Sequence, residues 1–218
     1  MLERITRREE ADLFVAWMAI AISFTIIKIA PYGITGPVSR IDPVIMLLYF
    51  GISLITVGIG FILHEMAHKF TAIRYGYWAE FRKDNVMLMI AVVMAALVGF
   101  VFAAPGATVI YSNTGDGRIM TREQNGIISA AGPALNLFLC VLFAIVFFSA
   151  GGVVALETGS ILAILGLAGI QINSMIAAFN LIPISVLDGR KVFAWNIPVF
   201  LVLAVAAFGT LYASFTIH

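Results

Sequence analysis

Charged side chains are scarce in this sequence. Asp, Glu, Lys and Arg make up only 11% of the 218 residues, whereas 61% are hydrophobic, and the mean hydropathy is +1.03. This composition is not that of an ordinary soluble domain. The formal net charge of +1 argues against nucleic-acid binding, which requires a strongly basic surface. The single cysteine, Cys140, excludes an internal disulfide.

Six apolar runs account for most of the chain. Each run is near or above the roughly 18 residues that a membrane-spanning helix needs. The runs cover residues 13–30, 44–73, 86–104, 127–150, 161–182 and 197–215. The sequence therefore predicts an all-α membrane protein, a polytopic helical bundle of five to six spans in contact with the lipid bilayer. We expect a single membrane-embedded domain over residues 1–218.

Three features lie between these runs. The Pro/Gly-rich stretch from Pro31 to Pro43 predicts an extramembrane turn, and Arg74 followed by Gly76 predicts the end of the second helix. At residues 105–121, TVIY and RIMT flank the turn-rich SNTGDG, which predicts a small β-hairpin. Because an open sheet edge cannot face lipid, this hairpin must lie in water or under helices.

The second run contains FILHEMAHKF, which places ionisable residues inside an apolar helix. Such residues are costly in a membrane and indicate a functional site. His64 and His68 are four positions apart, so both imidazoles lie on one helix face, as in an HExxH zinc site. Catalytic zinc keeps one position for water and makes that water a nucleophile. Glu65 would take the proton from the water and pass it to the leaving amine.

The third metal ligand is not part of this motif. Arg74 stands where a metzincin has its third histidine, so that class is excluded. Glu80 and Asp84 belong to the charged stretch AEFRKD, which predicts a solvated loop, and His218 is the last residue.

A better candidate is Asp188 in NLIPISVLDGRKV, residues 180–192. Pro183 interrupts the helix, and Gly189 permits sharp backbone geometry beside the carboxylate. A broken helix at membrane depth is tolerated where it lines an enclosed cavity, so Asp188 is well placed to complete a His₂Asp site. The alternative is an exposed Asp-Gly turn between two spans.

Three ordered motifs resemble one known family. HEMAH is followed by G-P-x-x-N at Gly132, Pro133 and Asn136, and then by N-x-x-P-x-x-x-L-D-G ending at Gly189. This order is similar to that of the site-2 protease family of intramembrane zinc metalloproteases, with a catalytic core at about residues 44–192. The resemblance implies cleavage of substrate proteins within or next to their transmembrane helices.

The resemblance also implies residue roles and one zinc ion per chain. The implied roles are metal ligands for His64, His68 and Asp188, catalytic base for Glu65, and substrate binding or polarisation of the scissile carbonyl for Asn136 and Asn180. Two alternatives stay open. A prenyl-protein-type zinc peptidase would need a glutamate as third ligand, but Glu157 lies in a loop. A membrane metal-binding or transport protein would use the histidines without hydrolysis.

A shared zinc constrains the topology. His68 and Asp188 both lie near the ends of spans, so an odd number of crossings must separate them, and we predict that residues 86–104 do not cross. With the N-terminus inside, ten Lys and Arg residues then lie on the cytoplasmic side, against Arg40 outside. They are Arg4, Arg7, Arg8, Arg74, Arg82, Lys83, Arg118, Arg122, Arg190 and Lys191. This positive-inside bias predicts that the N-terminus and the active site face the cytoplasm.

Overall fold

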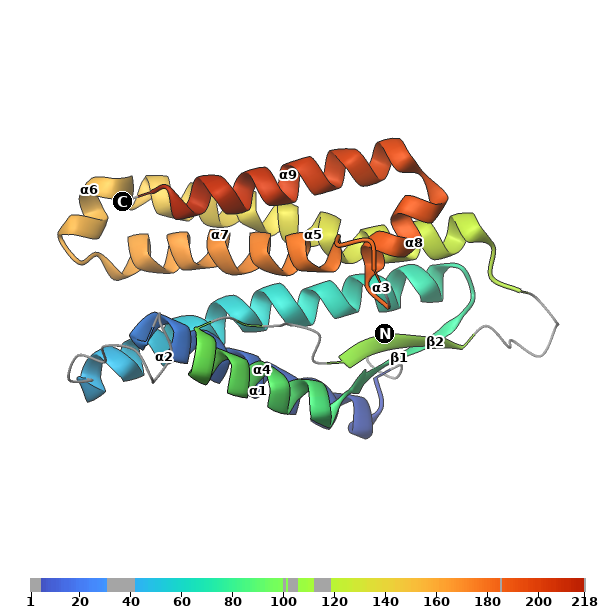
Figure 1. The fold of residues 1–218 in the computed structure, drawn as a ribbon, viewed down its shortest axis with the longest axis horizontal. Helices are drawn as coiled ribbons and strands as arrows, with labels where there is room; N and C mark the ends of the chain where they lie inside the picture. Colours follow the sequence, from blue (N-terminus) through green and yellow to red (C-terminus); the bar gives the residue numbers. More distant parts are fainter. Residues whose placement is uncertain are drawn as a thin grey trace. The chain divides into compact units, whose positions relative to one another are not determined.

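The structure is a computed structural model that describes residues 5–30, 42–99, 101, 106–111, 119–184 and 186–217. Within these residues, five helices are long and apolar enough to span a membrane (Figure 1). They are α1 (Arg7–Ile29), the continuous helix Pro43–Arg74, α5 (Arg122–Ser149), α7 (Ile161–Asn180) and α9 (Ile197–Phe215). The predicted all-α class is confirmed, and the five candidate helices agree with the predicted five to six spans. The predicted turns at residues 31–41 and 112–117, and His218, lie outside the described residues.

Several helix ends follow from local sequence. Thr121 and Gln124 form a capping box at the start of α5, in which each side chain accepts a hydrogen bond from the backbone N–H of the other. Ser160 caps α7 by accepting from the Ala163 N–H. The second span ends at Arg74, and Gly76 has a φ of +87°, which is the predicted helix stop.

The chain divides into two compact units. The first comprises residues 1–62 and 80–109, and the second comprises residues 63–79 and 110–218. The continuous second span contributes α2 (Pro43–Val57) and the π-helical η2 (Gly58–Ile62) to the first unit and α3 (Leu63–Arg74) to the second. The prediction of a single domain stays a prediction.

In the first unit, α1 packs against α2 and α4 (Asn85–Val98). The Trp17 indole N–H donates to the Leu54 carbonyl at 2.9 Å, and the missing side chain of Gly58 leaves room for that indole. Helix α4 has 14 residues, or about 21 Å of helix, which is shorter than a bilayer core of about 30 Å. The prediction that this run is not a span agrees with that length.

The small predicted sheet is present, but its strand pairing differs from the prediction. Strand β2 (Gly106–Tyr111) pairs in antiparallel fashion with β1 (Trp78–Lys83), and residues 119–121 form no strand. The predicted pairing of two strands within residues 105–121 is therefore wrong. Local turn residues suggested a local partner, whereas the actual partner lies before α4.

Strand β1 is also the stretch for which a solvated loop was predicted. Glu80 is buried in the strand and pairs with Arg82, whose other partner is Asp12 of α1 at 3.7 Å. The Phe81 N–H donates to the buried Glu9 carboxylate at 3.0 Å. The ion pairs of Arg82 and the hydrogen bond to Glu9 explain how charged residues are accommodated here. Asp84 instead caps α4 by accepting from the Val86 and Met87 N–H groups.

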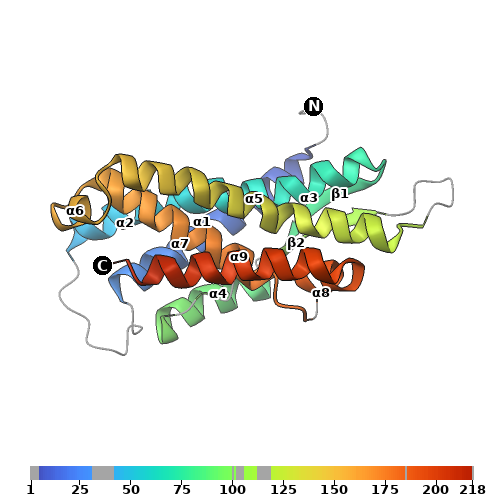
Figure 2. The same cartoon turned by 90° about the horizontal axis from the view of Figure 1, so that it is seen from above.

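In the second unit, α5 packs against α3, α7, α8 (Asp188–Trp195) and α9, and α7 also packs against α9 (Figures 1 and 2). Gly166 and Gly169 bring α7 close to α5, because a side chain at either position would overlap Phe147 or Phe143. The short α6 (Gly152–Glu157) follows α5.

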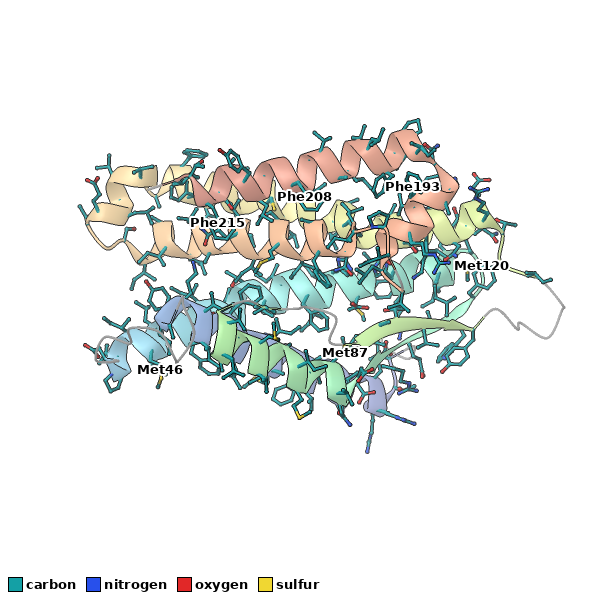
Figure 3. The ribbon with its side chains drawn as sticks, in the orientation of Figure 1. Met46, Met87, Met120, Phe193, Phe208 and Phe215 are labelled. Atoms are coloured by element: carbon teal, nitrogen blue, oxygen red, sulfur yellow. The ribbon has the colours of Figure 1, made fainter. Side chains whose placement is uncertain are left out.

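Much of α9 is apolar and exposed. Only 11% of its most apolar 18-residue stretch is buried. Phe208 and Phe215, which are labelled in Figure 3, are both exposed. An apolar helix surface without protein cover is typical of a helix that contacts lipid.

Candidate metal centre

Helix α3 places two imidazoles side by side. The ring centroids of His64 and His68 are 4.6 Å apart, and their Nε2 atoms are 3.0 Å apart. Only 2% of His64 and 6% of His68 is exposed. The i, i+4 spacing therefore produces the shared face that the sequence predicts.

Asp188 reaches the same point from a distant part of the chain. Helix α7 ends at Asn180, and the chain then turns so that α8 begins at Asp188. The Asp188 Oδ2 atom lies 3.0 Å from His68 Nε2 and 3.5 Å from His64 Nε2. The turn is tight, because a side chain at Gly189 would overlap the carbonyl of Leu181.

The other nitrogen of each imidazole is held by α5. The Nδ1 atom of His68 is 2.7 Å from the Ile128 carbonyl, and that of His64 is 2.5 Å from Oδ1 of the buried Asn136. Both oxygens can only accept, so each Nδ1 carries the hydrogen and each Nε2 keeps its lone pair. This arrangement is typical of metal-binding histidines, whose second nitrogen donates to a carbonyl or carboxylate.

The three inward-facing atoms are therefore all lone-pair donors. Their separations of 3.0–3.5 Å fit the spacing of about 3.4 Å between ligands that are each about 2.1 Å from a tetrahedral zinc ion. Three buried acceptors this close would repel each other without a cation or proton between them. His64, His68 and Asp188 are thus placed to bind a metal, and their two imidazoles and one carboxylate suit zinc.

Gly132 lies directly against the two histidines. A Cβ atom at this position would overlap the imidazoles of both His64 and His68. Packing therefore explains why the G-P-x-x-N motif has a glycine at this position. Without a side chain at Gly132, α5 can approach the rings closely enough for Ile128 and Asn136 to contact them.

A protein of Methanocaldococcus jannaschii named "putative zinc metalloprotease" is 36% identical to this chain over 193 residues. The aligned region covers 88% of this chain and 87% of the relative. The chain belongs to the same family as this archaeal protein. No family model matches the chain, and no solved structure matches it.

The relative's name agrees with the metal-binding geometry. Next to the ligands in sequence is Glu65, the predicted catalytic base. Glu65 lies on α3 next to His64 and is 7% exposed. Its role as a base stays a prediction. Among the described residues, His64, His68 and Asp188 form the one group of three His, Cys, Asp or Glu residues at metal-binding distance.

The two asparagines differ in their surroundings. Asn136 is fully buried, and its amide contacts His64 and Asn173, so these contacts support holding the His64 ring rather than binding substrate. Asn180 is partly exposed, and its amide donates to the Ile176 carbonyl of its own helix at 3.0 Å. Their predicted roles toward substrate stay predictions that these contacts do not support.

Sequence reasoning missed Asn173. This residue lies in the middle of α7, is fully buried, and accepts a hydrogen bond from the Asn136 amide at 2.9 Å. The available signal was an asparagine inside an apolar span, because buried polar groups there need a partner. The sequence alone does not identify that partner.

Proposed function

We propose that the protein is a zinc-dependent intramembrane protease of the site-2 type, with one zinc ion per chain. The observation that carries the proposal is the convergence of His64, His68 and Asp188 on one point. The two histidines and Glu65 belong to a helix that is apolar enough to span a membrane. The family relationship to a protein named as a zinc metalloprotease supports the same chemistry.

In this proposal the chain's own residues hold the metal and move protons. A bound zinc ion supplies a Lewis acid that makes water nucleophilic at neutral pH. His64, His68 and Asp188 hold it, while Ile128 and Asn136 keep the imidazole lone pairs directed at it. Glu65 accepts a proton from the attacking water and delivers one to the leaving amine.

The proposed substrates are membrane proteins that are cut within or next to a transmembrane helix. His68 is six residues from the helix end at Arg74, which places it about 9 Å along the helix from that end. A site at this depth reaches bonds near the membrane surface. We propose that this surface and the N-terminus face the cytoplasm, because the Lys and Arg residues gather on that side.

The deciding experiment compares wild type with Glu65→Gln. Both proteins are reconstituted in lipid vesicles with a panel of transmembrane helices, each placed between two reporter domains. We expect wild type to cut at least one helix, and Glu65→Gln to retain zinc without cutting, because the amide keeps the shape but cannot carry the proton. Glu157→Gln, which changes an exposed glutamate in α6, should behave as wild type.

The same experiment separates the alternatives. Zinc bound at one ion per chain with no cutting by wild type would favour metal binding or transport. Cutting by Glu65→Gln would remove Glu65 as the base.

A further inference from the structure

A chain of three side chains links His64 to a backbone carbonyl of α7. His64 Nδ1 contacts Asn136 Oδ1 at 2.5 Å, Asn136 Nδ2 donates to Asn173 Oδ1 at 2.9 Å, and Asn173 Nδ2 donates to the Gly169 carbonyl at 2.9 Å. Both asparagines are fully buried, so water does not replace these bonds. The chain runs from α3 through α5 to α7.

The direction of every bond follows from its last member. The Gly169 carbonyl can only accept, so the Asn173 side chain must present its NH₂ group to it. The Asn173 oxygen then faces Asn136 and accepts a hydrogen bond from the NH₂ group of Asn136. This leaves the Asn136 oxygen facing His64, where it accepts the Nδ1 hydrogen.

We infer that Asn173 is a positioning residue that fixes the tautomer of His64 through Asn136. An asparagine side chain can rotate to exchange its oxygen and nitrogen at little cost in shape, so the hydrogen bonds that Asn136 makes determine which atom faces the imidazole. With Asn173 in place, the exchanged arrangement sets two NH₂ groups against each other in a buried site, which is unfavourable. His64 therefore keeps its Nε2 lone pair directed at the metal position.

This inference rests on the proposed metal site but not on protease activity. The histidine tautomer can be measured in metal-free protein by ¹⁵N NMR of the imidazole nitrogens, after labelling with ¹⁵N-histidine. Cobalt affinity, measured by visible absorption, gives a second readout. Failure of the proposed hydrolysis would leave both measurements informative.

Asn173→Leu removes the link while approximately keeping side-chain volume. Without metal, a proton among the three ligand atoms can sit on His64 Nε2, so the readout is the hydrogen on His64 Nδ1. We expect metal-free wild type to carry this hydrogen throughout, whereas metal-free Asn173→Leu should show a population without it. Cobalt affinity should fall about tenfold, the lower end of the range for residues that support metal ligands. Asn173→Asp should restore both readouts, because in either protonation state its carboxyl group accepts from the Asn136 amide.

A matched control is Ser174→Ala. Ser174 is the next residue of α7, is equally buried, and donates to the Ile170 carbonyl at 2.7 Å. Its loss removes a buried hydrogen bond from the same helix without touching the chain to His64. We expect wild-type tautomer and cobalt affinity in this variant.

The Asn136→Asp background tests the route. Both carboxylate oxygens accept, so the orientation of residue 136 no longer matters, and Asn173→Leu should then leave the His64 tautomer unchanged. Thermal unfolding is measured for each variant, and Asn173→Ala replaces the leucine variant if that variant does not fold. Two results would overturn the inference: a wild-type tautomer in folded Asn173→Leu or Asn173→Ala, or an undiminished effect in the Asn136→Asp background.

Discussion

His68 Nδ1 lies 2.7 Å from the carbonyl of Ile128, sixty positions later in the chain. The same two helices meet again where His64 contacts Asn136, and Gly132 lies between the two contacts. The α5 positions 128, 132 and 136 recur every four residues, as do 64 and 68 on α3, so each set forms one stripe along its helix. The contacts pair early α3 positions with late α5 positions, so the helices are antiparallel.

Removing the carboxylate ligand should reduce zinc binding. Asp188→Ala leaves two protein ligands, which are too few for a stable catalytic site. We therefore expect a zinc content well below one ion per chain, measured by inductively coupled plasma mass spectrometry. Asp84→Ala is the matched control, because it removes an acidic residue that caps α4 instead. Full zinc occupancy in Asp188→Ala would remove this residue as the third ligand.

A methyl group at position 132 should disturb the site. Gly132→Ala would overlap both imidazoles, so we expect reduced zinc affinity and a loss of about 1–3 kcal/mol in the free energy of unfolding. Gly209→Ala on α9 is the control, since its new Cβ meets nothing within 4 Å. Chelator competition and thermal unfolding measure the two effects. Unchanged zinc affinity in Gly132→Ala would show that the close approach is not needed.

Strand β2 is expected to hold substrate in an extended form. A transmembrane helix hides its peptide carbonyls in internal hydrogen bonds, so it must unwind before hydrolysis, and an edge strand can pair with the unwound segment. Val109→Pro removes a backbone donor and should lower turnover of a reporter helix while sparing zinc. Val109→Thr keeps the donor and should preserve turnover. Equal turnover in wild type and the proline variant would assign β2 a purely structural role.

The proposed orientation can be tested by cysteine labelling in sealed vesicles, with the buried Cys140 replaced by alanine. Glu123 and Glu157 are exposed residues near the two ends of the α5 span. We expect Glu123→Cys to react only with reagent on the cytoplasmic side and Glu157→Cys only from the other side. The reverse pattern would invert the topology, and labelling of both from one side would exclude α5 as a span.

The sequence predicted those parts of the molecule that depend on local patterns. Five of the six apolar runs correspond to the candidate spans, and the four-residue spacing of His64 and His68 identified their shared face. Asp188 was a candidate because a proline and a glycine flank it in a broken helix, and the structure brings it to the histidines.

The errors concern contacts between residues far apart in sequence. The partner of β2 is β1, which precedes α4, and no turn signal reports such a pairing. Glu80 looked solvated because its neighbours are charged, yet one of those neighbours, Arg82, is its ion-pair partner. Asn173 is visible in the sequence as an asparagine inside an apolar span, but its partner Asn136 is identified only by the structure.

The matched stripes of α3 and α5 also bear on how this protein can diverge. Because side-chain contacts set the register of the two helices, the connecting segment between them does not need a fixed length. Insertions or deletions between positions 75 and 121 should leave the distances among the ligands unchanged. A one-residue insertion within α5 between Ile128 and Asn136 would instead rotate one contact by about 100° away from its histidine. Relatives should therefore vary in length between these two helices and keep the four-residue spacing within them.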